Sequence, residues 1–168
     1  MSNIKVLGIG SPFGEDQAGW KALEILKSRL SLNAILSPYI QMECHDRPGS
    51  NLIELMRDAN TVFLIDAVKS GQMPGIIHRL QNDEIQECKN LISTHHMGVA
   101  QSLQLGNALN ELPNNIILYG IEISHSDLQL TISEPVKRGI NQVAVELMHE
   151  IIDILTIMKI VHDSTALT

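Results

Sequence analysis

The chain has 168 residues, 44% of them hydrophobic, which suffices for one domain with a sizeable core but not for two. Its 12 basic and 19 acidic residues leave a formal charge of −7, which disfavours nucleic acid and anionic membrane surfaces as partners because both attract basic faces. No apolar run approaches the ~18–20 residues of a membrane span, the N-terminus lacks a signal-peptide pattern, and two cysteines cannot build a disulfide framework, so we expect a cytoplasmic protein.

Strands and helices alternate along the chain. The first apolar run predicts a strand buried on both faces over residues 4–9, followed by a helix over 17–30 whose apolar residues recur at helical spacing. Further strands are predicted over 39–44, 61–67, 73–80 and 115–123, with 73–80 as a candidate antiparallel edge strand. Helices are predicted over 51–57, from a Ser93–Thr94 cap to about residue 109, and from Ser133 onward, where Pro135 suits a first turn.

This alternation predicts a three-layer α/β/α fold, with a mostly parallel, twisted sheet of about five strands and helices on both faces. Residues 1–160 form the predicted single domain, and residues 161–168 are expected to be a flexible C-terminal tail. Open α/β sheets bind ligands at the carboxyl ends of their strands. We therefore expect functional residues in the segments that directly follow the buried strands.

The most informative of these segments runs from Lys5 to Gly19, where a buried strand leads into glycines and then into the adjacent acids Glu15 and Asp16. Glycine loops at this edge often bind phosphate, but carboxylates repel it, and the glycine spacing also departs from the dinucleotide fingerprint. The loop therefore indicates a metal or an electropositive group. A first-turn acid that stabilises the following helix is the alternative interpretation of Asp16.

Two further segments place side chains at the same edge. Asp66 ends the apolar run 62–65, where a buried carboxylate is costly unless it is paired, hydrogen-bonded or bound to metal. A structural acid that accepts loop N–H groups is the alternative. His95 and His96 follow Ser93–Thr94, and one of the two rings is expected to face the site rather than the surface or the core. Two carboxylates and one imidazole suit a borderline divalent ion such as zinc or nickel.

Other candidates have weaker patterns. Cys44, His45 and Asp46 lack a second ligand cluster, so a structural role is favoured for them. Ser11 and Ser93 have no neighbouring base that the sequence identifies, and no Gly-x-Ser-x-Gly elbow is present. The remaining histidines are expected on the surface or on helix faces: His78, His125, His149 and His162.

Three ordered motifs resemble the hydrogenase maturation endopeptidases. They are Val6-Leu-Gly-Ile-Gly10 with Glu15-Asp16 and Gly19, Leu64-Ile-Asp-Ala-Val68, and Ser93-Thr-His95 with Gly98. The late segments Gly120-Ile-Glu122 and Ser133-Glu-Pro-Val136 also match the usual ending of that family, so the resemblance spans residues 4–155.

The resemblance implies a metal-dependent, nickel-recognising endopeptidase in which Asp16, Asp66 and His95 bind metal and form the catalytic site. Its implied substrate and partner is the precursor of a [NiFe]-hydrogenase large subunit, from which it removes a C-terminal extension. The nickel belongs to that precursor, and another divalent ion in the free enzyme is an alternative. The sequence does not indicate an oligomeric state.

Some features of the motifs leave alternatives open. Ser11 stands where the family commonly has asparagine, and the acid pair is Glu15–Asp16 instead of two acids beginning at residue 16, so Glu15 competes with Asp16 as the ligand. His96 is a second imidazole next to His95. The main functional alternative is a non-catalytic nickel-sensing chaperone of the same maturation pathway, followed by a nucleotide-binding oxidoreductase and a zinc hydrolase of small substrates.

Overall fold

The computed structural model describes residues 4–31, 36–88, 92–93, 98–124 and 131–165, with backbone alone at 37, 92–93 and 159–165. Five strands form the sheet in the order β2–β1–β3–β6–β4, and a short sixth strand pairs with β3. Their bounds are β1 (Ile4–Gly10), β2 (Ile40–Asp46), β3 (Thr61–Lys69), β4 (Ile77–Gln81), β5 (Ile92–Ser93) and β6 (Asn115–Glu122). Strands β2, β1, β3 and β6 run parallel, whereas β4 is antiparallel to β6.

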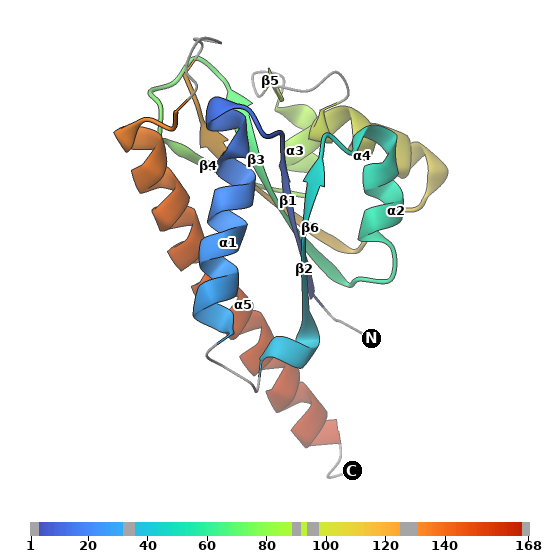
Figure 1. The fold of residues 1–168 in the computed structure, drawn as a ribbon. Coiled ribbons are helices and arrows are strands. Elements are labelled where there is room, and N and C mark those ends of the chain that lie inside the picture. Colours follow the sequence, from blue (N-terminus) through green and yellow to red (C-terminus); the bar gives the residue numbers. More distant parts are fainter. Residues whose placement is uncertain (1–3, 32–35, 89–91, 94–97, 125–130, 166–168) are drawn as a thin grey trace.

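Helices cover both faces of this sheet. On one face, α1 (Ala18–Leu30) lies side by side with the long α5 (Glu134–Thr165), as Figure 1 shows. The other face is covered by α2 (Leu52–Met56), α3 (Asp83–Glu87) and α4 (Val99–Leu109). Short 3-10 helices occupy Gly14–Gln17 (η1), Ser37–Tyr39 (η2) and Gly49–Asn51 (η3). The predicted three-layer fold with about five main strands is confirmed.

Two apolar clusters hold the layers together. Alternate residues of each strand point to opposite faces, so Phe63 and Ile65 of β3 pack with α1 and α5, whereas Val62 and Leu64 pack with α2, α3 and α4. Every residue of β3 from Thr61 to Val68 is buried, as expected for a central parallel strand covered on both sides.

The main departure from the predicted elements lies before α4. Ser93 was predicted to cap this helix, but it lies in β5, and α4 begins at Val99 after the extended residue Gly98. The prediction is wrong because β3 continues past Ile65, where its pairing with β1 ends. The exposed backbone of β3 there pairs with β5, with Val68 opposite Ser93.

Smaller departures have local causes. Strand β4 begins at Ile77, later than predicted, because the preceding residues form a turn in which the Ile76 N–H donates to the Met73 carbonyl at 3.2 Å. Helix α3 was not predicted, and α5 continues to Thr165, beyond the point where the C-terminal tail was predicted to begin. No helix in the described part of the chain is long and apolar enough to cross a membrane.

A close approach of α1 to the sheet fixes the carboxyl edge. A Cβ atom at Gly19 would lie 2.4 Å from the carbonyl oxygens of both Ile9 and Ile65, so only glycine lets the helix start this near to β1 and β3. Gly8 and Gly10 make similar room, since a Cβ there would lie 3.0 Å from the Gly19 oxygen and 2.5 Å from the Asp16 oxygen respectively. These glycines therefore serve helix–sheet packing, which explains the glycine-rich sequence without a bound phosphate.

A polar cluster fastens α5 to the antiparallel end of the sheet. Arg79 of β4 donates through Nε to Glu150 Oε2 of α5 at 3.1 Å, and the Tyr119 hydroxyl of β6 donates to the same oxygen at 2.7 Å. Burial alone raises the pKa of Glu150, but the hydrogen bonds from Arg79 and Tyr119 and the Arg79 charge outweigh it, so the pKa lies below its ordinary value of 4.5. The ionised form of Glu150 therefore stabilises the fold.

This pKa shift predicts an acid-dependent effect of the Glu150→Gln substitution. A carboxyl whose pKa is lowered in the folded state stabilises the fold above the unfolded value of 4.5, and that contribution is lost as the pH falls through the folded pKa. At pH 7 we expect the variant to unfold about 2–4 °C below wild type, as for a loss of ~1 kcal/mol from a partly solvated ion pair. Thermal unfolding followed by circular dichroism should show this gap closing below pH 4.5.

Glu87→Gln is the matched control, because Glu87 is exposed and has no ion pair among the described residues. It should follow the wild-type pH profile. If the difference in Tm between wild type and E150Q stays constant down to pH 3, the ionised form of Glu150 does not stabilise the fold as proposed.

Candidate functional site

The loop after β1 carries the first predicted site residue, Asp16. It lies in η1, is half-buried, and accepts a hydrogen bond from the buried Ser11 hydroxyl to its Oδ2 at 3.1 Å. Its backbone N–H donates to the Phe13 carbonyl at 3.1 Å, and Gly14 between them has a φ of +51°, a conformation that favours glycine. The Asp16 carboxylate is therefore held at the carboxyl end of β1, and Ser11 is the one described residue whose side chain donates a hydrogen bond to it.

Glu15, the competing acid, has a different environment. It is 6% exposed, and its carboxylate accepts hydrogen bonds from the Ser124 N–H at 2.8 Å, the Ser133 N–H at 3.0 Å and the Ser133 hydroxyl. Both oxygens are engaged, one at the chain leaving β6 and the other at the chain entering α5. Glu15 thus joins the two ends of the 124–133 connection to the β1 loop, which is a structural task.

Asp66 lies near the carboxyl end of the central strand. It is 1% exposed and sits directly after Ile65, whose carbonyl oxygen contacts the start of α1 at Gly19. Because η1 and β3 are in contact, the loop that holds Asp16 and the end of β3 that holds Asp66 lie at the same edge of the sheet. The predicted convergence of the two acids at one edge is thus found in the fold.

His95 and His96 lie outside the described residues. The nearest described position before them is Ser93, which pairs with Val68, two residues beyond Asp66 in β3. Within the described part of the chain, no three His, Cys, Asp or Glu side chains form a group that could hold a metal ion. Asp16 and Asp66 are two carboxylates at this edge, and the described residues contain no third side chain that would complete a ligand set with them.

Glu122 forms a second polar cluster at this edge, one that sequence reasoning missed. Its fully buried carboxylate accepts hydrogen bonds at Oε1 from the backbone N–H groups of Ser70 and Gly71, at 2.7 and 3.1 Å. At Oε2 it accepts the Ser70 hydroxyl at 2.8 Å and lies 2.9 Å from His78 Nε2. His78, predicted on the surface or a helix face, is therefore a strand residue bonded to a buried acid.

This cluster does not have the arrangement of a catalytic triad. In a Ser-His-acid triad the serine and the acid bond to opposite nitrogens of the imidazole ring. Here the Ser70 hydroxyl, at 3.5 Å, and Glu122 both lie at Nε2 of His78, and the hydroxyl donates to the acid. Glu122 instead fixes the loop after β3. The cluster could have been predicted only from the pairing of β4 with β6, in which His78 lies opposite Gly120. The sequence does not specify this register.

The remaining candidates have local partners. His45 Nε2 lies 3.0 Å from Glu43, and Arg47 donates to Asp46 at 2.7 Å. Cys44 is a free thiol whose pKa is raised by burial, so it is a weak nucleophile at neutral pH. No second ligand group accompanies this segment in the described residues.

The fold and this edge define a class: a three-layer α/β protein with acidic side chains at the carboxyl ends of its central strands. Residues 48–150 match the family described as hydrogenase maturation protease (HycI). The chain belongs to the hydrogenase maturation protease family, and the family predicted from the sequence motifs is confirmed.

Curated relatives agree with this assignment. The chain is 29% identical over 122 residues to the hydrogenase expression/formation protein HupD of Thiocapsa roseopersicina, a match that covers 71% of this chain and 53% of HupD. The chain thus spans about half the length of that relative. It is also 29% identical over 121 residues to the hydrogenase 2 maturation protease of Escherichia coli, covering 70% of this chain and 71% of the relative.

Solved structures share the fold. The hydrogenase maturating endopeptidase HybD from Escherichia coli aligns with a TM-score of 0.74 at 22% identity over 90% of this chain and 93% of that chain. The [NiFe] hydrogenase maturation protease HybD from Thermococcus kodakarensis aligns with a TM-score of 0.66 at 25% identity, covering 88% and 97%.

The contrast between Glu15 and Asp16 yields a stability prediction. Glu15→Gln removes the charge that strengthens three hydrogen bonds, so we expect a loss of about 2–3 kcal/mol, or a Tm lower by roughly 5–10 °C for a chain of this size. The measurement is thermal unfolding by calorimetry at neutral pH.

Asp16→Asn is the control, because it removes the same charge from the neighbouring position, where the only described side-chain bond comes from Ser11. It should change Tm by no more than about 2 °C, because Asp16 is only half-buried and an asparagine oxygen can still accept the Ser11 hydrogen bond. Equal losses from both variants would mean that Glu15 has no special structural role.

Proposed function

We propose that the chain is an endopeptidase that removes a C-terminal extension from the nickel-loaded precursor of a [NiFe]-hydrogenase large subunit. Asp16, Asp66 and His95 face the nickel that the precursor carries. The observation that carries this proposal is the position of Asp66, a buried carboxylate at the end of the central strand, next to the loop that presents Asp16. Membership of the maturation protease family supports the same function.

The chemistry of these residues suits a cation in the substrate. A carboxylate with 1% exposure loses most of its hydration, so a positive partner brought by the substrate would stabilise its ionised form. Carboxylate oxygens with one imidazole nitrogen form a ligand set that borderline divalent ions such as nickel accept. Three protein ligands also leave positions for the groups that already hold the metal in the precursor.

The inclusion of His95 rests on the course of the backbone before it. Strand β5 runs antiparallel to β3, with Ile92 opposite Lys69 and Ser93 opposite Val68. Ser93, the last residue of β5, is thus opposite the position two residues beyond Asp66. The Ser93-Thr-His95 motif, which resembles that of the family, supports the inclusion of His95 among the ligands.

Peptide hydrolysis at this site requires activated water. Among the described residues, the hydroxyls near the edge are bound to acids: Ser11 to Asp16, Ser70 to Glu122 and Ser133 to Glu15. None has a histidine placed to remove its proton in the manner of a triad. Water is therefore the proposed nucleophile, activated either by a carboxylate that acts as general base or by a metal that lowers its pKa. The cytoplasmic location expected from the sequence fits the free thiols of Cys44 and Cys88.

Cleavage should depend on the nickel of the precursor. Purified protein is incubated with the nickel-loaded and the nickel-free large-subunit precursor, and the products are weighed by mass spectrometry. We expect loss of the extension from the nickel-loaded form alone, because the metal completes recognition at the edge of the sheet. Equal cleavage of both forms would rule out recognition through nickel. Stable binding without a change in mass would indicate the nickel-sensing chaperone instead.

Substitution of the proposed ligands should abolish this cleavage. We expect Asp66→Asn, His95→Ala and Asp16→Asn each to lower the rate at least about 100-fold, since each removes a group proposed to contact the metal. Rates are measured on the nickel-loaded precursor at equal enzyme concentration.

Two exposed residues of α5, away from the site, provide matched controls: Asp153→Asn and His149→Ala. Both should keep the wild-type rate. Full activity in any one of the site variants would remove that residue from the proposed site.

A further inference from the structure

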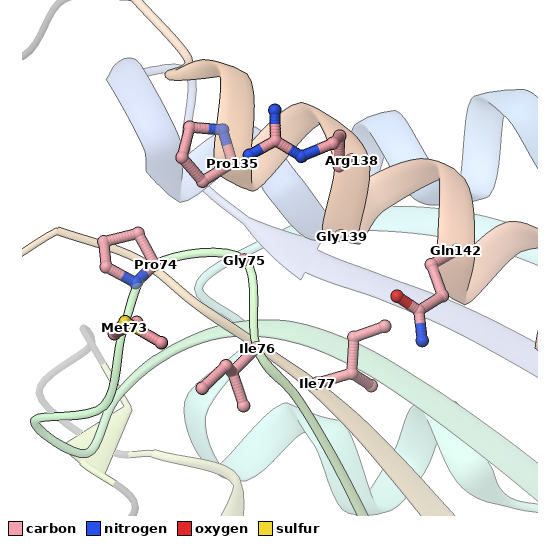
Figure 2. Close-up of a pocket in the computed structure, with 9 residues that line it drawn as sticks. All are labelled: Met73, Pro74, Gly75, Ile76, Ile77, Pro135, Arg138, Gly139 and Gln142. Atoms are coloured by element: carbon pink, nitrogen blue, oxygen red, sulfur yellow. The ribbon is translucent and has the colours of Figure 1, made fainter.

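A groove of about 720 Å³ lies between the segment that leads into β4 and the first turns of α5 (Figure 2). One wall carries apolar side chains, including Met73 and Ile77, and the other carries Arg138 and Gln142 of α5. Met73 is 73% exposed, which is unusual for a large apolar side chain. The groove is thus an open channel with one apolar wall and one polar wall.

The floor of this groove is fixed by backbone contact. A Cβ atom at Gly75 would lie 2.3 Å from the Pro135 oxygen, and one at Gly139 would lie 2.7 Å from the Gly75 oxygen, so two glycines allow the segment and the helix to touch. The Gly75 N–H also donates to the Glu122 carbonyl at 2.8 Å. The groove is therefore formed before any ligand binds.

The groove opens onto an edge strand with unused backbone groups. The Glu122 N–H donates to the Ile76 carbonyl, so in the antiparallel pair the alternate residues Ile77 and Arg79 turn their backbone N–H and C=O groups away from β6. No other strand in the described part of the chain pairs with this side of β4. Such an edge is a ready site for an extended peptide.

The charge of the groove favours a carboxylate. Arg138 is the one charged residue among its lining residues, is exposed, and forms no ion pair with any described residue. The neighbouring Lys137 is instead paired with Glu134 at 2.6 Å. A guanidinium with no ion pair among the described residues complements an acidic group of a ligand, and guanidinium–carboxylate pairs are strong and directional.

The groove also lies within reach of the proposed site. Ile77 of β4 is opposite Ile121 of β6, and the adjacent Gly120 is opposite Asp66 of β3, so the groove and Asp66 are two strands apart at one level of the sheet. Two strand spacings are about 10 Å. Because Asp66, like Val62 and Leu64, belongs to the face opposite the groove, the extension must also pass over the carboxyl end of β6 to reach it.

From these features we infer that the groove binds the extension of the precursor, downstream of the bond that is cut. The extension adds to β4 as an extended strand and places a carboxylate on Arg138. This inference rests on the proposed function, because it names the part of that substrate that the groove holds. The carboxylate is either the C-terminus of the extension or an acidic side chain within it.

Peptide binding tests the groove independently of cleavage. The probe is a fluorescein-labelled synthetic peptide with the extension sequence of the large-subunit precursor encoded in the same genome, and its affinity is measured by anisotropy. We expect Arg138→Gln to weaken binding about five- to tenfold, because a charge-assisted contact is lost. Lys137→Gln removes the same charge one residue away and should leave the affinity unchanged.

Modified peptides identify the carboxylate and the strand. Two peptides lack a carboxylate: one has a C-terminal amide, and the other has its acidic side chains converted to amides. The peptide that lacks the recognised carboxylate should bind wild-type protein about five- to tenfold more weakly than the unmodified peptide does. R138Q should not weaken the binding of that peptide any further. Single N-methylation along the peptide should weaken binding at alternate positions, because only every second N–H of an added strand faces β4.

Unchanged affinity in R138Q, an equal loss in K137Q, or N-methyl effects without a period of two would each overturn the inference. If the wild-type protein binds the peptide with the expected pattern but leaves the nickel-loaded precursor uncut, the groove stands and the proposed proteolytic function fails. If the nickel-loaded precursor is cut but R138Q does not change the affinity for the peptide, the proposed proteolytic function stands and the inference about the groove fails.

Discussion

The contact between the start of α1 and the ends of β1 and β3 is the constraint on which the rest of this structure depends. At Gly19 the helix approaches so closely that a Cβ atom would lie 2.4 Å from two strand carbonyl oxygens. Because the helix starts there, the 3-10 turn before it must lie over the carboxyl edge, and this turn carries Glu15 and Asp16. The same contact brings this turn to Ile65, the residue before Asp66. A side chain at position 19 would separate the loop from the strand and with it the two acids of the proposed site.

The acids at this edge have distinct tasks that follow from their hydrogen bonds. Glu15 binds two backbone N–H groups and a hydroxyl, and Glu122 binds two backbone N–H groups, a hydroxyl and His78. Both hold loops in place. Asp16, by contrast, is half-buried, and among the described side chains only the Ser11 hydroxyl donates a hydrogen bond to it. Glu15 and Glu122 are therefore structural acids that hold the loops at the edge where the proposed recognition of nickel occurs.

The antiparallel strand β4 differs from the parallel strands at the centre of the sheet in its burial and in how it is attached to the helices. Strand β4 is short and half-buried, and it is held to α5 through Arg79, Glu150 and Tyr119. This attachment keeps the first turns of α5 beside the segment around Gly75, where backbone contact forms the floor of the groove. An outward-facing strand edge and the Arg138 guanidinium, which has no ion pair among the described residues, then lie along one channel. The proposed metal site and the proposed peptide groove thus occupy neighbouring parts of one rim.

The sequence by itself determined the three-layer fold, the order of the main strands and helices along the chain, and the family, because buried strands such as 61–67 and helical spacing in 17–30 are local patterns. It also indicated Asp66, which ends the apolar run 62–65, and Asp16, which lies in the loop after the first apolar strand. Only the tertiary structure separated Glu15 from Asp16, because the partners of Glu15, Ser124 and Ser133, are more than 100 residues away in the chain. The assignment of Ser93 to a strand, the His78–Glu122 pair and the groove beside β4 were likewise decided by strand register and helix packing. These are contacts between distant segments, and no local pattern of residues encodes their geometry.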